Sequence, residues 1–488
     1  MTGGSLLART ARGAGWVMAW RLGMRVLGLV STLVLVRLLA PADFGIIALA
    51  SGFMQTIDGV MTLGVEEAVI REHAPDRHVY DTAFTINLLR GVLVGAMVAV
   101  AAFPAAQFFN DPRLAPVLLV VACLPVLDGM ANIGAVDFRR DFAFHKEFAI
   151  MVLPKLGGIL AAIIGAILLR SYVAMLLGMG VNRSLRMVMS YVMHPYRPRL
   201  SVRAWRGLVG YSVWTWLLSL AILLRDRSDT LLLGRLLGPA PLGFYSVGAE
   251  VAALPTTELV EPLCRASFSG FAEARRTGTQ VGATFVRLIG LAAMVTLPAG
   301  VGLSLVAVPL VRVAFGPGWD AAVPVLQVLG IAGTMMVLGQ ISLHLMSAHA
   351  LLARLVGISL IGALLRVALL AALIPAFGVA GAAWAVAIAV VVEQTLTLAM
   401  AMRRFGVSIL SLLRQVWRPP LAATGMAAIL WASGLGWGSS TTVTDLALGV
   451  GTGAVVYGGL LLCAWLASGR PDGAEADVLA AARRVIGR

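Results

Sequence analysis

The chain alternates long apolar runs with short polar breaks over most of its 488 residues. Each run has about 20 residues, which is the length that an α-helix needs to cross the hydrocarbon core of a bilayer. The pattern predicts an all-α polytopic membrane protein with about fourteen transmembrane helices. The expected helices cover residues 14–38, 44–65, 82–105, 114–135, 148–169, 171–192, 208–233, 242–262, 283–311, 321–345, 351–374, 377–401, 419–436 and 443–467.

Composition agrees with this pattern and excludes a soluble protein. Hydrophobic residues make up 59% of the chain and charged residues 13%, and the mean hydropathy is +0.90. A secretory leader would be followed by soluble sequence, so we expect the first apolar run to stay as a helix. The net charge of +14 does not indicate nucleic-acid binding, because a nucleic-acid binder needs a basic face on a water-exposed domain.

The positive charge instead predicts the orientation of the helices. Lysine and arginine accumulate in cytoplasmic loops. When both termini are placed in the cytoplasm, only five arginines remain on the outer side, namely Arg37, Arg113, Arg170, Arg235 and Arg312. The outer loops are also short, so no extracellular catalytic domain is expected.

A repeated turn predicts that the chain is duplicated. RLLAPADFG, from Arg37 to Gly45, returns as RLLGPAPLG, from Arg235 to Gly243, and the two copies start 198 residues apart. Six expected helices separate the copies, and an even number keeps the orientation. We expect a first six-helix lobe at 1–206, a second at 207–405, two extra helices at 406–468 and a cytoplasmic tail at 469–488. Transporters built from parallel repeats bind substrate at the repeat interface.

These motifs resemble the polysaccharide flippases. RLLAPADFG, GRLLGPAPLGFYSVG and FGPGWDAAVPVLQVLGIAG, the last from Phe315 to Gly333, are similar to turn signatures of the O-antigen or lipopolysaccharide branch of the multidrug/oligosaccharidyl-lipid/polysaccharide exporter superfamily. The resemblance covers roughly residues 10–405. It implies a bacterial inner-membrane protein that moves a lipid diphosphate-linked oligosaccharide to the outer leaflet by alternating access. It also implies a polyprenyl diphosphate-linked substrate and contact with polysaccharide polymerase machinery.

Cations inside the spans are the first candidates for substrate binding, since charge in a span usually faces a cavity or a partner. Arg21 and Arg25 lie four residues apart, so they share one face of the first helix. Guanidinium groups bind phosphate oxygens through paired donors, which suits a diphosphate. The alternative is that both side chains snorkel to the cytoplasmic interface.

Two further pairs of cations recur at nearly the repeat spacing. Arg90 and Arg287 are 197 residues apart, and Lys155 and Arg354 are 199 apart. A basic site shared by the two repeats would place positive charge on both sides of one anionic headgroup. Chance placement near the inner interface is the alternative. Three other arginines in spans lack a partner at this spacing and rank lower, namely Arg183, Arg186 and Arg366.

Charged and polar residues of a second group are candidates for gating or ion coupling. RDRSD, from Arg225 to Asp229, contains four charges in five residues, including Asp226, and is expected to form a gate or a static ion-pair network. Arg225 and Asp229 are spaced to pair with each other. Carboxylates that lie in or at the ends of spans include Asp58, Asp128 and Glu393, together with Glu250, Glu258 and Glu261. Asn132, expected on one helix face with Asp128, and Gln340 with His344 could hydrogen-bond sugar hydroxyls or neighbouring helices.

The sequence predicts no catalytic residue, cofactor or metal site. Cys123, Cys264 and Cys463 are far apart and lie in or beside apolar runs, and no hydrolase or nucleotide-binding motif appears. Two alternatives to the flippase remain. A small-molecule exporter of the same superfamily would favour an acidic cavity. An O-antigen ligase or polymerase would need a long outer loop with catalytic residues.

Overall fold

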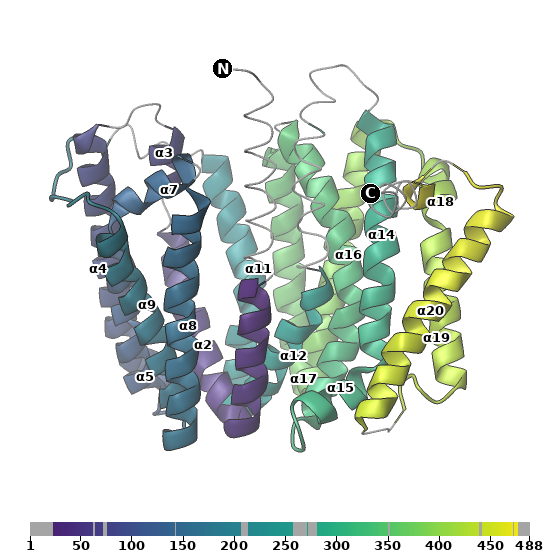
Figure 1. Cartoon of the computed structure of the whole chain (residues 1–488), viewed down its shortest axis with the longest axis horizontal. Coiled ribbons are helices and arrows are strands. Elements are labelled where there is room, and N and C mark those ends of the chain that lie inside the picture. Colours follow the sequence, from purple (N-terminus) through teal and green to yellow (C-terminus); the bar gives the residue numbers. More distant parts are fainter. Residues whose placement is uncertain are drawn as a thin grey trace. The chain divides into compact units, whose positions relative to one another are not determined.

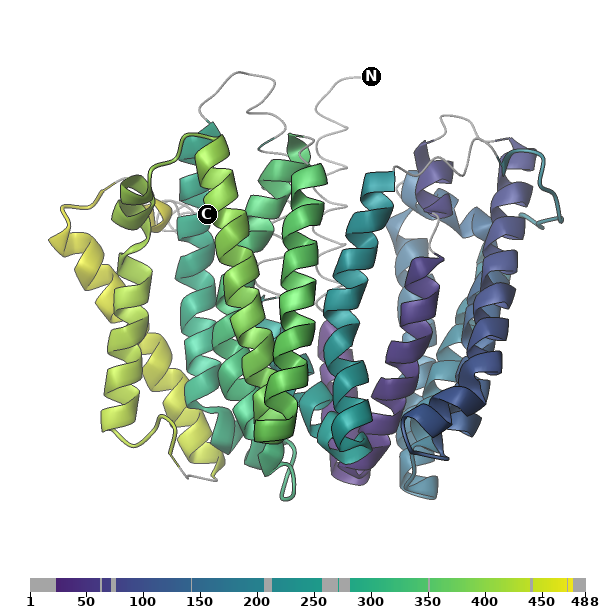
Figure 2. The ribbon, with the colours of Figure 1, turned by 180° about the vertical axis from the view of Figure 1, so that it is seen from behind.

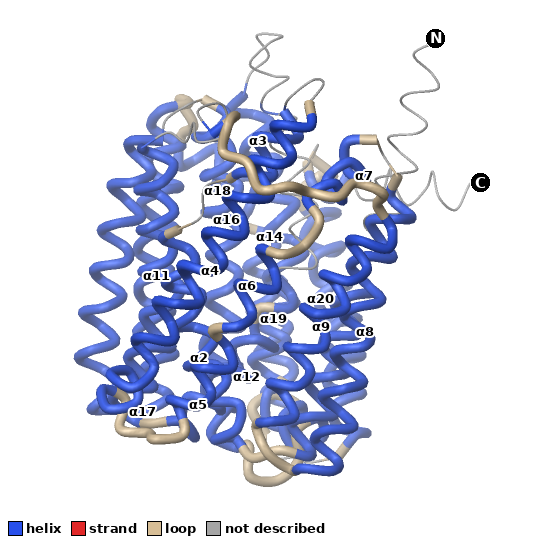
Figure 3. The backbone as a smooth tube through the Cα atoms, turned by 90° about the vertical axis from the view of Figure 1, so that its left-hand side faces the viewer, coloured by secondary structure: helices blue, strands red, loops and turns tan. Residues whose placement is uncertain are grey.

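The computed structural model describes residues 23–61, 64–71, 76–141, 143–205, 213–256, 271, 281–349, 352–438, 442–471 and 473–476. Within these ranges the regular structure is helical, and no strand occurs there. Figure 3 shows this arrangement of long helices joined by loops. The expected all-α polytopic fold is confirmed.

The helices follow the apolar runs closely. After a first helix at residues 23–38, the structure has α2 (Pro41–Val60), α3 (Val65–Arg71), α4 (Arg77–Phe108), α5 (Leu114–Val121), α6 (Cys123–Gly129), η1 (Ile133–Val136), α7 (Asp137–Arg140), α8 (Phe144–Leu169), α9 (Val173–Met193), α11 (Val213–Leu237), α12 (Pro239–Ala252), α14 (Val281–Leu305), α15 (Ala307–Ala314), η2 (Asp320–Ala322), α16 (Val323–Ala348), α17 (Leu352–Arg404), α18 (Ile409–Val416), α19 (Arg418–Ala432) and α20 (Val443–Ala467).

Six of these helices are long and apolar enough to cross a membrane, or seven if α5, α6, η1 and α7 together form one broken span. That broken span bends by 69° between Gly129 and Ile133. The expected helix over 114–135 is therefore interrupted, and Asn132 lies outside the helix that carries Asp128. The expectation that these two residues share one helix face is wrong. The count of fourteen stays a prediction.

The chain divides into two compact units. Unit 1 contains residues 1–223 and 237–243, and unit 2 contains residues 224–236 and 244–488. The division falls inside α11 and α12. The proposed lobe boundary at 206/207 stays a prediction.

Unit 1 is a bundle in which sequential helices pack on one another. The helices α8 and α9 form its most extensive contact, and α4 packs against α5 and α6 (Figure 1). Glycines bring α4 and α6 together, since a Cβ at Gly91 would lie 2.3 Å from the backbone oxygen of Pro125. At one end, Val69, Phe84 and Ile133 join a buried apolar cluster that holds α3 against α4 and η1.

Unit 2 contains the long helix α17, which bends at a single residue. Gly378 has φ 59° and ψ −134°, a conformation that a residue with a side chain rarely adopts. The bend falls at the second residue of the expected helix 377–401, two residues after the expected break at 375–376. Figure 2 shows the chain turning back in this region. The helix α16 packs between α14 and α17.

The last two long helices, α19 and α20, form a hairpin that packs on α14 of the same unit. Leu305 of α14 contributes to a buried cluster with Ala422, Met426 and Leu430 of α19. The Tyr457 hydroxyl of α20 donates to the Met294 carbonyl at 2.8 Å. The C-terminal helices are thus an integral part of unit 2.

The two copies of the repeated turn lie against each other within unit 1. Pro41 and Pro239 each begin a helix, α2 and α12 respectively. A Cβ at Gly45 would lie 1.7 Å from the Pro239 oxygen, and a Cβ at Gly243 would lie 1.8 Å from the Pro41 oxygen. Because the contact is reciprocal, glycine is required in both copies for the turns to approach this closely.

Candidate functional site

The first candidate group lies on α2 and α4 of unit 1. The Arg90 guanidinium contacts the Asp58 carboxylate, with 2.8 Å between Nη1 and Oδ1. Both side chains are partly exposed, at 24% for Arg90 and 34% for Asp58. Because this ion pair is still accessible although it lies between apolar helices, a ligand can replace one of its two partners.

A second ion pair joins α6 to α9. Arg183 Nη1 lies 2.8 Å from Asp128 Oδ1, and the side chains are 34% and 29% exposed. Asp58 and Arg186 also act electrostatically on Asp128. The two pairs and Arg186 therefore form one group of charges, which we call the unit 1 charge cluster (Asp58, Arg90, Asp128, Arg183, Arg186).

A small cavity of about 70 Å³ adjoins this cluster. Its walls include Asp128 and Arg186, and it extends to Arg139 and Glu147 near the end of the unit. Charged and apolar residues both line the cavity, which has room for water. Arg139 is held there by Glu147 at 2.9 Å. Charged groups at the end of the unit thus line the same cavity as Asp128.

Two further cations lie at the first helix. One is Arg25 of that helix, and the other is Lys155 of α8. Lys155 Nζ donates to the Met24 carbonyl at 2.9 Å, and Gly28 lies close beside it. Arg25 is one residue from Met24 and is half-buried. Lys155 and Arg25 therefore bring positive charge to the same part of the first helix. Arg21 lies outside the described residues.

Unit 2 carries a buried network instead. Arg225 lies 2.8 Å from Asp226 and 3.0 Å from Glu393 of α17. Asp229 contacts Arg366 at 2.8 Å and accepts a hydrogen bond from the Tyr245 hydroxyl at 2.7 Å. Arg225 thus pairs with Asp226 and Glu393, and Asp229 pairs with Arg366, so the expected Arg225–Asp229 pair is replaced by links from α11 to α17.

The two groups differ in accessibility. The side chains of Arg366 and Asp229 are only 9% and 11% exposed, whereas those of the unit 1 charge cluster are more open. A buried pair cannot give up a partner without leaving an uncompensated charge. The geometry therefore favours ligand exchange in unit 1 and a structural role in unit 2.

Arg287, the expected repeat mate of Arg90, lies in a different setting. It is exposed near the start of α14 and lines a cavity of about 650 Å³ with residues of α18. Arg354 of α17 is exposed and lies near the start of that helix. The expectation that these pairs form one shared basic site remains a prediction.

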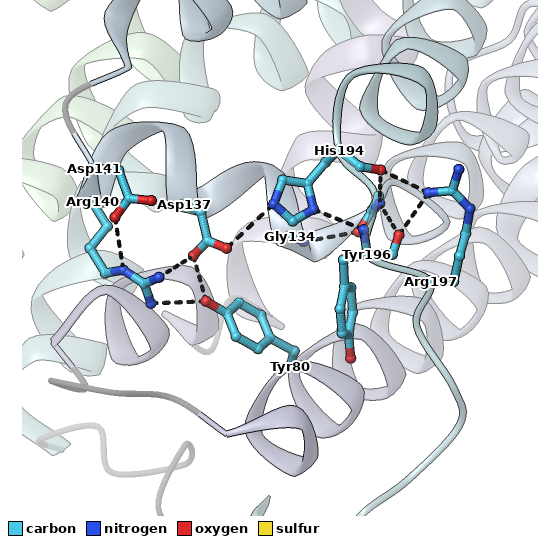
Figure 4. A network of polar contacts seen from close by, with 9 residues as sticks. Tyr80, Gly134, Asp137, Arg140, Asp141, His194, Tyr196 and Arg197 are labelled. Carbon is cyan, nitrogen blue, oxygen red and sulfur yellow. Dashed lines mark hydrogen bonds and ion pairs between the residues drawn. The ribbon is translucent and has the colours of Figure 1, made fainter.

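A polar network at the end of unit 1 was not expected from the sequence. Asp137 accepts a hydrogen bond from Tyr80 and pairs with Arg140 at 3.0 Å and with His194 at 3.4 Å (Figure 4). The His194 Nδ1 accepts from the backbone N–H of Tyr196 at 3.2 Å. Burial lowers the pKa of His194, and a neutral ring is what this acceptor role requires.

The same network fastens the extended segment that follows α9, which we call the strap (residues 194–204). Asp81 accepts from the Arg199 backbone at 2.7 Å, and Thr85 accepts from the Ser201 backbone at 2.8 Å. Asn132 donates to the Tyr196 carbonyl at 2.7 Å. The amide of Asn132 thus binds the strap.

The other expected sugar-binding pair lies in α16. There the His344 ring contacts the Gln340 carbonyl of its own helix.

Comparison with known proteins identifies the family. The sequence profile of a family described as "Polysaccharide biosynthesis protein" matches residues 34–324, which is more than half of the chain. The chain belongs to this family. The resemblance of the turn motifs to polysaccharide flippases is confirmed.

Curated relatives carry related names. The chain is 24% identical over 339 residues to the lipopolysaccharide biosynthesis protein WzxC of Escherichia coli, covering 69% of each chain. It is also 24% identical to the succinoglycan biosynthesis transport protein ExoT of Rhizobium meliloti, covering 66% of this chain and 65% of that protein.

Solved structures show the same fold. The lipid II flippase MurJ in an inward closed conformation matches with a TM-score of 0.73 at 14% identity, covering 92% of this chain and 98% of that chain. An inward-facing multidrug resistance transporter of the MATE family matches with a TM-score of 0.62 at 14% identity, covering 80% of this chain and 98% of that chain. This polysaccharide biosynthesis protein is therefore a multi-pass helical membrane protein.

Proposed function

We propose that this protein is a flippase that moves a lipid diphosphate-linked oligosaccharide from the cytoplasmic to the outer leaflet during surface polysaccharide biosynthesis. The observation that carries the proposal is the match of a polysaccharide biosynthesis family to a chain with accessible arginines inside its apolar helices. A neutral sugar needs no such cations. A diphosphate headgroup does.

Arg90 is the binding residue that the geometry favours most, with Arg25 and Lys155 as further cations of unit 1. In the described state Arg90 has Asp58 as its partner at 2.8 Å. A diphosphate can replace this carboxylate, since guanidinium binds phosphate oxygens through the same fork of donors. The released Asp58 must then be neutralised by a proton or a cation, and this exchange would couple transport to an ion gradient.

Asp128 is the second candidate for ion coupling. Its partner Arg183 is partly exposed, and the cavity beside it has room for water that could carry a proton to Asp128. The RDRSD segment and Glu393 are assigned a structural role. Their mutual pairs hold α11 against α17 while unit 2 moves as one body.

The two alternative functions, a small-molecule exporter and a ligase or polymerase, are less well supported. A cationic-drug exporter of the same superfamily needs carboxylates with spare negative charge. Among the described residues, Asp58, Asp128, Asp229 and Glu393 each have an arginine partner. A ligase or polymerase is disfavoured because the relatives include a named transport protein. We place the protein in the bacterial inner membrane with both termini in the cytoplasm, where it can meet polymerase machinery.

Deletion of the gene tests this function. If the protein is a flippase, the polyprenyl-linked oligosaccharide accumulates on the cytoplasmic leaflet, whereas loss of a ligase or polymerase causes accumulation outside. Complementation with Arg21→Ala and Arg25→Ala together, or with Arg90→Gln, is expected to leave the intermediate inside. Arg312→Gln, on α15, is the matched control and should restore surface polysaccharide. Full restoration by the Arg90→Gln protein would remove Arg90 from the binding site.

A further inference from the structure

A cavity of unit 2 lies beside a short amphipathic helix. The cavity of about 650 Å³ is lined by Arg287 of α14, by the loop at Gly406, by Ser411 and Gln415 of α18, and by Gly473. This volume lies within the range of small-molecule sites, roughly 300–1,000 Å³. Its walls combine one cation, the polar side chains of Ser411 and Gln415 and three glycines with apolar residues such as Val286 and Phe405. This mixture suits a lipid headgroup at the boundary with its acyl chains.

The position of α18 places the cavity at the surface of the membrane. The helix connects the end of the long span α17 to the start of α19. The lining residues of α14 lie between Val281 and Arg287, in its first two turns. Six residues of helix rise about 9 Å, which is comparable to the depth of one headgroup layer. Since α14 and α17 are long and apolar enough to cross a membrane, the end of unit 2 that carries the cavity is where we expect the lipid phosphates.

The exposed face of α18 is apolar. Ile409, Leu410, Leu413 and Trp417 are 68%, 54%, 56% and 44% exposed, and their spacing puts them on one face of the helix. Leu412 is buried. A helix with leucine and tryptophan on one face and arginine on another lies in the interface plane of a bilayer. The apolar face of α18 is thus available to acyl chains while Ser411 and Gln415 face the cavity.

Among the described residues, the charges on the elements that line the cavity are mostly positive. Arg287, Arg403, Arg404 and Arg414 are all exposed on α14, α17 and α18. The acid Glu475 lies beside Gly473 and pairs with the buried Arg418 at 3.2 Å. Arginines next to a membrane surface attract anionic lipids.

We propose that this cavity binds the phosphate headgroup of an anionic phospholipid of the inner leaflet. Arg287 contacts the phosphate, the Gln415 amide donates to the headgroup, and the acyl chains lie along the apolar face of α18. In this proposal Arg287 binds a phospholipid of the surrounding membrane, whereas the cations of unit 1 bind the transported lipid. The packing of α14 and α18 would then depend on the content of anionic lipid in the membrane.

Native mass spectrometry of the purified full-length protein tests the site, with phosphatidylglycerol and phosphatidylcholine added at equal concentration. We expect preferential binding of phosphatidylglycerol. Arg287→Gln is expected to weaken it by roughly tenfold or more, since a hydrogen bond to a charged group is lost. Arg287→Lys should restore part of the binding. Arg312→Gln, another exposed arginine of the same unit, is the matched control.

Three further measurements test the acyl-chain face, the source of the phosphate and the headgroup contact. Leu413→Asp should weaken phosphatidylglycerol binding because it disrupts the acyl-chain face, and inorganic phosphate should not compete. Ser411→Asp, compared with Ser411→Asn, should repel the headgroup. Equal binding of both phospholipids, or wild-type binding by Arg287→Gln, would overturn the proposal. Binding of polyprenyl diphosphate that phosphatidylglycerol cannot displace would also overturn it and return Arg287 to the substrate site, whereas the flippase assignment would stand.

Discussion

Replacing Gly45 by alanine tests whether the contact between the two repeated turns belongs to the transport cycle. The new Cβ would lie 1.7 Å from the Pro239 oxygen, whereas ordinary contact begins at 3.4 Å. The turns must therefore separate by about 1.7 Å, the difference between these distances. The obstacle is backbone, so no side-chain rotation relieves it.

The expected cost follows from this geometry. Inserting a methyl group into a closely packed site costs about 1–3 kcal/mol when the surroundings can shift. If the turns touch in one conformation of the protein and separate in another, this cost applies only to the first conformation. The substitution then lowers the population of the first conformation relative to the second by roughly 5–150-fold. Gly243→Ala should act alike, because the two glycines share one contact. The double variant should be far from additive, since the first methyl group has already opened the turns.

Distance measurement between spin labels provides the assay. Labels at Arg37 and Arg235 occupy equivalent exposed positions, at the first residue of each copy of the motif. The unsubstituted protein should show a population at short distance, and Gly45→Ala should reduce it. Gly302→Ala is the control, because a Cβ there meets nothing within 4 Å. Unchanged distances together with normal transport by Gly45→Ala would refute the reasoning.

Three other substitutions separate the roles of the charged groups. Asp58→Asn should lower the stability by less than about 1 kcal/mol, because the ion pair with Arg90 is partly exposed. It should nevertheless alter the ion dependence of transport in proteoliposomes. An unaltered ion dependence would contradict the coupling role of Asp58. Asp229→Ala should cost about 3–5 kcal/mol because Arg366 is left buried and uncompensated, as thermal unfolding would show; a stable variant contradicts the structural role. For His194, burial lowers the pKa below the ordinary 6.5, so the unfolded chain binds more protons. Stability should fall as the pH decreases through about 6.5, and His194→Gln should flatten this dependence in unfolding measured at several pH values.

The helices could be predicted because bilayer thickness and apolar run length leave little freedom. The expected span at 443–467 agrees residue for residue with α20, and the bend of α17 at Gly378 lies two residues after the expected break. The interruption between Gly129 and Ile133 was missed, because LAPVLLVVACLPVLDG and the residues after it stay apolar through the bend. Hydropathy measures composition and does not detect a change of direction.

The partners of the charged residues were harder to predict. Arg183 and Arg366 ranked low because neither has a mate at the repeat spacing, yet each pairs with an acid on another helix. Repeat spacing identifies equivalent positions, whereas pairing depends on which helix faces meet. The strap was missed for a related reason. Its anchors Asp81 and Thr85 lie on α4, more than a hundred residues from the backbone groups that they bind.

The most direct test of the flippase assignment is a transfer assay in proteoliposomes. The purified protein is reconstituted with a polyprenyl diphosphate-linked oligosaccharide, and a membrane-impermeant oxidant reports how fast the glycan appears in the opposite leaflet. The account predicts transfer well above protein-free vesicles and its loss in Arg90→Gln. Transfer no faster than in empty vesicles, with folded protein present and a cationic dye transported instead, would contradict it.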